Sequence, residues 1–134
     1  MMTMLFARRA LLRRQRAVAA LLALAIVLGL FVLGAQPLAV GLVPVPWDKV
    51  AHASVFAALA GVIGLASGLR GWRMIVLAAF GALLVGVLDE WHQVFLPGRQ
   101  AGWDDLAADA VGGFIGGMLL AVVFRGRDRV KQRF

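Results

Sequence analysis

The chain contains no cysteine among its 134 residues. Disulfide bridges, thiolate nucleophiles and thiolate metal sites are therefore excluded, while the redox compartment stays undetermined. The sequence also lacks a Ser-His-Asp spacing, a glycine-rich phosphate loop, an internal repeat and the apolar–polar alternation of strands. What it has instead is hydrophobic residues, which make up 62% of the chain, whereas soluble domains contain about half.

Four apolar stretches are long enough to cross a bilayer, which requires about 20 mostly apolar residues. They cover residues 17–35, 48–67, 72–95 and 104–124. Too little sequence remains for a separate soluble domain, so we predict an all-α protein, a four-helix transmembrane bundle. Its membrane domain covers residues 17–124, between a basic segment at 1–16 and a basic tail at 125–134.

Helix-breaking and helix-capping residues predict where the spans begin and end. Prolines at positions 37, 44 and 46 place a loop after the first span, and Pro97-Gly98 ends the third. Asp48 is expected to cap the second helix, and Asp104 or Asp105 the fourth. The first span is longer than the apolar region of a secretory signal peptide, about 7–15 residues, so we expect an uncleaved anchor.

Basic residues are distributed unequally around the spans. Five arginines precede the first span, five basic residues follow the last, and Arg70 and Arg73 flank the turn between the second and third. The opposite helix ends carry only Lys49 and Arg99. By the positive-inside rule, both termini are predicted to be cytoplasmic. Because these charges flank apolar spans, we expect membrane lipids as partners and no nucleic acid.

Six of the seven acidic residues fall at the helix ends opposite the termini. Antiparallel spans joined by short loops bring these ends together. The adjacent carboxylates of Asp89 and Glu90 are costly at the end of a membrane helix and need a compensating partner. Asp109, one turn inside the fourth span, must bind a proton or find a partner. The polar residues gathered here are Asp48, Lys49, His52, Asp89, Glu90, His92, Gln93, Arg99, Asp104, Asp105 and Asp109.

Several of these residues also have a purely structural interpretation. His52 can be an interhelical hydrogen bonder, Lys49 can extend toward the interface, and His92 can face headgroups. The four tryptophans lie near helix ends and fit an interfacial belt. Gly112 and Gly116 belong to overlapping Gly-x-x-x-Gly patterns, which permit close helix packing within the chain or in a homo-oligomer.

The order and spacing of these residues resemble the VanZ-like family of small bacterial integral membrane proteins. The pattern is Asp48-Lys49-x-x-His52-x-x-x-Phe56, then Asp89-Glu90-x-x-Gln93-x-Phe95-x-Pro97-Gly98-Arg99-x5-Asp105-x3-Asp109-x-x-Gly112-x3-Gly116. Asp109 departs from the family pattern, which usually has Asn there, so this position need not be a neutral hydrogen bonder. The resemblance implies a four-helix protein of the bacterial inner membrane and, for the founding member, an association with teicoplanin resistance. It also implies functional roles for His52, Glu90, Gln93, Arg99 and Asp105.

Three functions are compatible with these residues. The first is a site that binds or modifies a lipid or cell-envelope headgroup, in which Arg99 grips a phosphate or carboxylate. The candidate catalytic residues are His52, Glu90 and Asp105. The candidate binding residues are Arg99, Gln93, Asp48, Lys49, Asp89 and Asp109. The alternatives are a proton-coupled transporter and a non-catalytic accessory protein of the envelope or of antibiotic resistance, so whether the protein is an enzyme stays open.

The oxygen ligands of this cluster raise the question of a metal ion. Hard divalent cations prefer carboxylate oxygens, which Asp89, Glu90, Asp105 and Asp109 would offer. No motif with tight ligand spacing along the chain supports such a site. The sequence therefore predicts no metal and no other cofactor.

Overall fold

A computed structural model describes residues 2–131 of the chain as an all-helical protein. The helices are α1 (Met2–Leu28), α2 (Trp47–Ser67), α3 (Gly71–Gln93) and α4 (Trp103–Lys131). A π-helical turn, Gly29–Leu33, extends α1, and a single 3-10 turn, Pro37–Ala39, lies in the loop that follows. No strand occurs within residues 2–131, which confirms the predicted all-α class.

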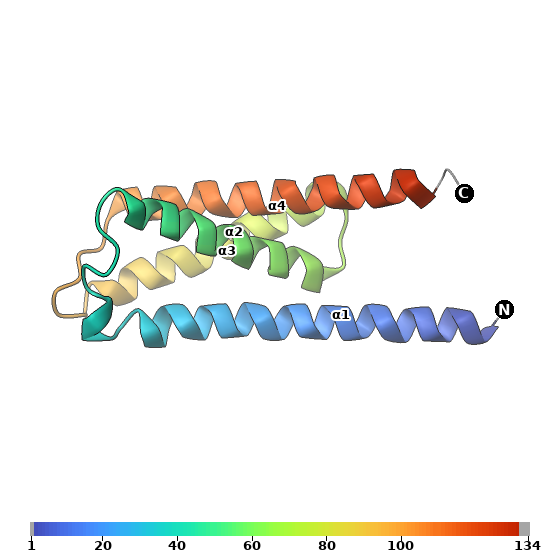
Figure 1. Cartoon of the computed structure of the whole chain (residues 1–134), viewed down its shortest axis with the longest axis horizontal. Helices are drawn as coiled ribbons and strands as arrows, with labels where there is room; N and C mark the ends of the chain where they lie inside the picture. Colours follow the sequence, from blue (N-terminus) through green and yellow to red (C-terminus); the bar gives the residue numbers. More distant parts are fainter. Residues whose placement is uncertain (1, 132–134) are drawn as a thin grey trace.

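Each of the four helices contains a segment long and apolar enough to cross a membrane. These segments are Phe6–Leu33, Trp47–Ser67, Gly71–Gln93 and Trp103–Val130. The protein is therefore a multi-pass membrane protein built as a four-helix bundle. The basic segments at the two ends of the chain are helical as well. Residues 2–16 form the first part of α1, and residues 125–131 form the last part of α4. Figure 1 shows the start of α1 and the end of α4 at one end of the bundle, opposite the starts of α2 and α4.

The N-terminal caps of two helices differ from the sequence prediction. α2 begins at Trp47, and Pro46 occupies the cap position without a side-chain hydrogen bond. Asp48 therefore lies in the first turn of α2, one position beyond the first helical residue. Asp104 and Asp105 likewise lie in the first turn of α4. Carboxylates in a first turn still stabilise the helix because they face the positive end of its dipole.

The bundle interior is built largely from small residues. Gly112 and Gly116 on α4 pack directly on the backbone of α2, where a Cβ at either position would overlap the carbonyl oxygen of Ala53 or Ala57. The next residues along α4, Gly113 and Gly117, face α3. The Gly-x-x-x-Gly pattern thus packs α4 between two neighbouring helices of the same chain, which lets their backbones approach closely.

Large apolar side chains cover much of the outer surface. Phe80, Phe114 and Leu119, for example, have exposed fractions of 65%, 55% and 60%. The four tryptophans are also exposed and lie at or near helix ends. A lipid bilayer can accommodate this surface because its hydrocarbon is as apolar as the side chains themselves.

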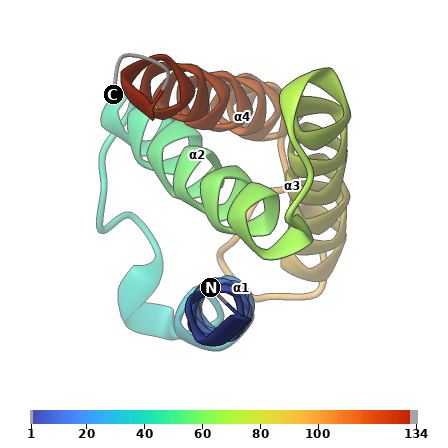
Figure 2. The same cartoon turned by 90° about the vertical axis from the view of Figure 1, so that its right-hand side faces the viewer.

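Helix α2 occupies the centre of the arrangement and contacts α1, α3 and α4. Seen end-on in Figure 2, α1 lies beside α2 on the side away from α4. Partly buried residues of α1, including Ala23, Ile26 and Val27, pack against the core around Phe56 and Leu59. Because α2 lies against both α3 and α4, side chains in its first two turns can meet those of the other two helices.

Candidate functional site

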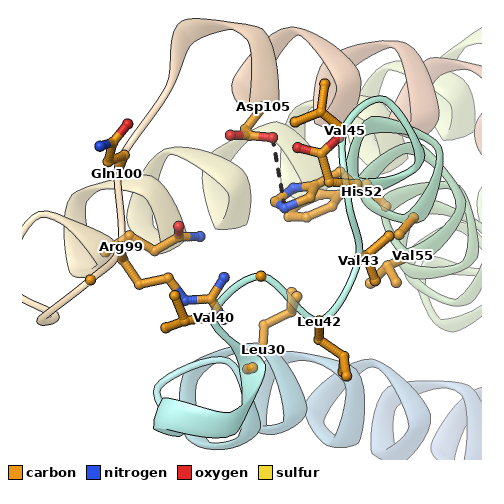
Figure 3. Close-up of a pocket in the computed structure, with 17 residues that line it drawn as sticks. Leu30, Val40, Leu42, Val43, Val45, His52, Val55, Arg99, Gln100 and Asp105 are labelled. Atoms are coloured by element: carbon orange, nitrogen blue, oxygen red, sulfur yellow. Dashed lines mark ion pairs between the residues drawn. The ribbon is translucent and has the colours of Figure 1, made fainter.

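Polar side chains from α2, α3, α4 and the loop before α4 converge at one end of the bundle. Two cavities open among them, with volumes of about 460 and 120 Å³. Four residues line both cavities: Leu30, His52, Gln93 and Arg99. Figure 3 shows Arg99 and the His52–Asp105 pair bordering the larger cavity. The structure thus brings residues of all predicted polar helix ends around a shared space.

Lys49 joins the first turns of α2 and α4. Its Nζ lies 3.1 Å from Asp48 Oδ2, 2.8 Å from Asp104 Oδ2 and 2.5 Å from Asp105 Oδ1. The Lys49 and Asp105 side chains are largely buried, with exposed fractions of 28% and 14%. One ammonium group therefore offsets three carboxylates, and it holds the two helix starts together.

His52 and Asp109 form the deepest polar contact of the site. His52 Nδ1 lies 2.9 Å from Asp109 Oδ1, and Asp109 is completely buried. The imidazole lies parallel to the ring of Phe56, one helical turn along α2, with ring centroids 6.4 Å apart. Space for the Asp109 carboxylate comes from Gly86 on α3, where a Cβ would lie 2.9 Å from Asp109 Oδ2. This glycine carried no functional assignment in the sequence.

The adjacent carboxylates of Asp89 and Glu90 point to different partners. Asp89 Oδ2 accepts a hydrogen bond of 3.0 Å from Gln93 Nε2, one turn along α3. Glu90 Oε2 accepts one of 2.7 Å from the backbone N–H of Gly102, just before α4. Successive residues of a helix diverge by about 100°, so neighbouring carboxylates need separate partners. Both side chains are buried, with exposed fractions of 4% and 8%.

Arg99 connects the loop after α3 to the end of the first span. Its Nη2 donates a 2.7 Å hydrogen bond to the carbonyl oxygen of Gly34, which follows the π-helical turn of Gly29–Leu33. A cation at a helix C-terminus is favourable because the last carbonyl groups carry partial negative charge. Arg99 Nε is buried and has no hydrogen-bond partner within the described chain.

Sequence reasoning missed the contribution of the first span and the loop that follows it. Leu30 lines both cavities, and Gly34 receives Arg99. The loop supplies apolar wall residues to the larger cavity, namely Val40, Leu42, Val43 and Val45. None of these residues is distinctive along the chain, because apolar residues are common throughout it. Their role depends on where the loop returns across the bundle.

His92 lies in the last turn of α3. Its ring stacks on Phe31 with centroids 5.2 Å apart, and it lines only the smaller cavity. His92 is therefore half-buried, between α3 and the π-helical turn. Packing against an aromatic ring explains this position without a chemical role.

The fold and this site define an α-helical multi-pass membrane protein with a buried polar cluster at one end. Residues 1–125 match the family model described as VanZ/LLP1. The chain therefore belongs to the VanZ-like family, as the motif in spans two to four predicted. The match also covers the first span, which the motif did not include. Comparisons with curated proteins and with solved structures gave no match.

Proposed function

We propose that the larger cavity binds the headgroup of a membrane lipid or of a lipid-linked envelope precursor. The polar end would lie at the extracytoplasmic face of a bacterial inner membrane, as the charge distribution predicts. The observation that carries the proposal is the mixed lining of this cavity. Arg99, Gln93 and His52 line the same space as an apolar loop wall, which suits an amphiphile with a polar head.

The cavity volume of about 460 Å³ is within the range of about 300–1,000 Å³ typical of small-molecule sites. Arg99 uses one donor on Gly34 and keeps others for a ligand. A planar guanidinium can grip a phosphate or carboxylate through two parallel hydrogen bonds. Because its contact with Gly34 holds the side chain in place, less conformational entropy is lost when an anion binds.

Chemical modification of the bound headgroup would require an acid or base beside it. His52 is the best candidate because it lines the cavity and its ring is oriented by Asp109. Asp105 is a candidate positioning residue, since its Oδ1 lies 3.9 Å from His52 Nε2 and is also held by Lys49. Glu90 would act on the same histidine, since one of its carboxylate oxygens lies within 4.8 Å of a ring nitrogen of His52. Binding needs fewer assumptions and is the function that this geometry supports best.

Binding can be tested with dodecyl phosphate as an anionic amphiphile and dodecyl maltoside as a neutral one. Purified protein in nanodiscs should bind the phosphate more tightly by calorimetry. Arg99→Ala should weaken this binding by about 10- to 100-fold, because a hydrogen bond to a charged group contributes about 1.5–3 kcal/mol. Arg73→Ala is the matched control, since Arg73 is exposed at the other end of α3.

Equal binding of the two amphiphiles, or equal losses in Arg99→Ala and Arg73→Ala, would contradict the proposal. A His52→Gln variant separates binding from chemistry. If it binds dodecyl phosphate as the unmodified protein does, His52 is not part of the binding contact. Its contribution, if the protein is an enzyme, must then be to a reaction step.

A further inference from the structure

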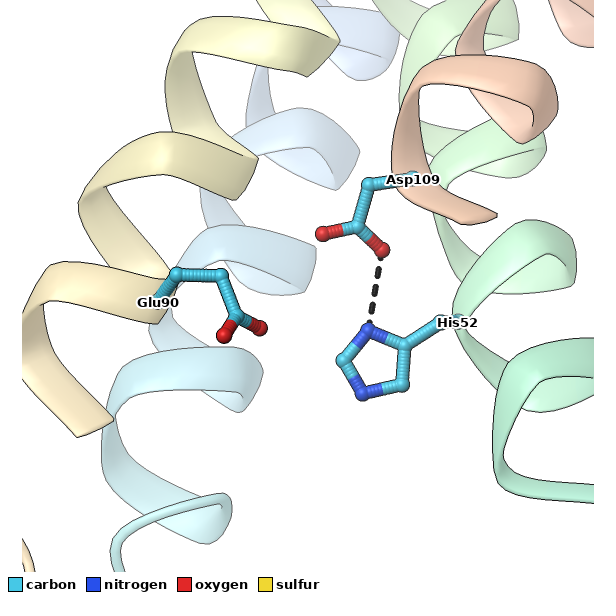
Figure 4. A group of neighbouring side chains, drawn as sticks. All are labelled: His52, Glu90 and Asp109. Atoms are coloured by element: carbon cyan, nitrogen blue, oxygen red, sulfur yellow. Dashed lines mark hydrogen bonds and ion pairs between the residues drawn. The ribbon is translucent and has the colours of Figure 1, made fainter. Parts of the chain in front are cut away.

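Three side chains from three different helices meet in the interior behind the cavity. They are His52 from α2, Glu90 from α3 and Asp109 from α4. One nitrogen or oxygen atom from each lies within 4.8 Å of the corresponding atoms of the other two. Figure 4 shows the Glu90 carboxylate directed toward the His52–Asp109 pair. The spacing of residues along the chain does not reveal this set, because each of the three residues comes from a separate span.

Two of the three residues retain buried atoms without hydrogen bonds. Asp109 is fully buried and Glu90 has an exposed fraction of 8%. Asp109 Oδ2 and Glu90 Oε1 have no partner among the described residues. A buried oxygen without a partner costs free energy, and most such atoms in folded proteins are paired. The cluster therefore has unmet capacity to bind a further group that interacts with carboxylate oxygens.

The charge balance points to a cation as this group. Six of the chain's seven acidic residues lie at this end of the bundle, against Lys49 and Arg99 as permanent cations. Lys49 is already shared by three carboxylates, and the hydrogen bond that Arg99 makes is to a backbone carbonyl. Within residues 2–131, neither cation forms an ion pair with Glu90 or Asp109. Buried carboxylates are stabilised when they are paired with opposite charge or coordinate a metal.

We propose that His52, Glu90 and Asp109 bind a divalent metal ion of the zinc type. Imidazole favours transition metals over magnesium or calcium, and carboxylates complete a mixed nitrogen and oxygen set. Zinc sites with three protein ligands keep a further position for water or substrate. That position would adjoin the cavities, which His52 also lines. The proposal is independent of headgroup binding because the ion needs only these three side chains.

To bind zinc, the ligand atoms of His52, Glu90 and Asp109 need to move only slightly closer together. Zinc–ligand distances of about 2.0–2.2 Å place tetrahedral ligand atoms about 3.3 Å apart. The observed separations are within 4.8 Å, and the His52–Asp109 contact is 2.9 Å. Zinc binding would therefore need a shift on the order of 1 Å, mainly of the Glu90 carboxylate. The long side chain of Glu90 can make this shift by a change of rotamer.

The test measures zinc bound by purified full-length protein, by calorimetry and by metal analysis after dialysis. We expect one zinc ion per chain. His52→Gln, Glu90→Gln and Asp109→Asn should each weaken zinc binding by at least about tenfold, since even residues that only orient metal ligands contribute that much. The matched controls are His92→Gln and Asp104→Asn, which remove the same groups outside the cluster and should bind zinc as the unmodified protein does.

A second measurement covers the possibility that a variant does not fold. Cobalt(II) bound to the unmodified protein should give the intense visible absorption of a low-coordinate site with protein ligands. A weak spectrum like that of the hydrated ion would overturn the proposal. So would the absence of stoichiometric zinc, unchanged zinc affinity in all three ligand variants, or displacement of zinc by an equal concentration of magnesium. The last result would exclude imidazole coordination in particular.

Discussion

The close packing of α4 on α2 leads us to predict that two glycines of α4 cannot be replaced by alanine without loss of stability. Gly112 and Gly116 have no space for a Cβ, because the atom would overlap the carbonyl oxygen of Ala53 or Ala57. Backbone atoms on both sides cannot move aside as a flexible side chain would. Gly112→Ala and Gly116→Ala should therefore force the two helices apart and destabilise the bundle.

The expected size of the effect follows from the contact itself. Restoring ordinary van der Waals distance requires the helices to separate by on the order of 1 Å, which loses a quarter to a half of the dispersion energy of the atoms that part. Overpacked interiors typically cost about 1–3 kcal/mol, and a backbone contact belongs at the upper end. We expect each substitution to lower the free energy of unfolding by about 3 kcal/mol.

The two positions should differ in their effect on the site. Gly112 lies one turn from Asp109 on α4, and Ala53, which it contacts, is adjacent to His52. Separation of the helices at this level would also separate His52 from Asp109, so Gly112→Ala should impair zinc binding. Gly116 lies a further turn from the site. Gly116→Ala should lower stability with a smaller effect on zinc binding.

Unfolding by SDS in mixed micelles, followed by circular dichroism, measures both stabilities. Gly61→Ala is the matched control because Gly61 lies within α2, where an added Cβ would meet no neighbouring atom within 4 Å. It should be neutral or stabilising by up to about 1 kcal/mol, since alanine favours the helix over glycine. If all three variants unfold at the same SDS fraction, the close approach of α2 and α4 is refuted.

Two further predictions concern charge and orientation. Lys49→Met should destabilise the bundle by about 1–3 kcal/mol, because three carboxylates lose their shared cation. Lys49→Arg keeps the charge and should restore most of this stability. Equal stability of all three forms in SDS would contradict the role of Lys49 as the shared cation. The chain lacks cysteine, so single-cysteine variants report membrane sidedness directly. A thiol reagent that cannot cross the membrane should label Gln100→Cys in intact cells but label Asp128→Cys only after lysis; the reverse pattern would invert the predicted orientation.

The number of helices and the loops between them were accessible from the sequence because hydrophobicity and helix breakers act locally. The outer ends were not, since α1 begins at Met2 and α4 ends at Lys131, beyond the predicted spans. The run from 17 to 35 and the prolines after it predict a helix and then a loop whatever the rest of the chain does. The gathering of polar ends followed from the same reasoning, since short loops make consecutive spans antiparallel. Cap positions were less accurate, because Asp48 is as favourable in a first turn as at a cap.

The partners of individual polar atoms were not accessible in this way. Uniformly apolar helices can rotate about their axes with little change in hydrophobic burial, so periodicity leaves their facing sides undetermined. The contact of Arg99 with Gly34 illustrates this limit, because it joins residues 65 positions apart. Gly86 is a second example, since nothing in its neighbourhood along α3 indicates that it makes room for Asp109.

The sequence by itself determined that this protein crosses a membrane four times and collects its scarce carboxylates at one end, because length, hydropathy and charge are properties of the chain alone. Only the tertiary structure decided that His52, Glu90 and Asp109 meet in the interior. The physical reason is the group of four glycines on α4 at positions 112, 113, 116 and 117. Their close packing on α2 and α3 selects one rotation of α4 about its axis. In this rotation Asp109 faces the other two residues and is completely buried.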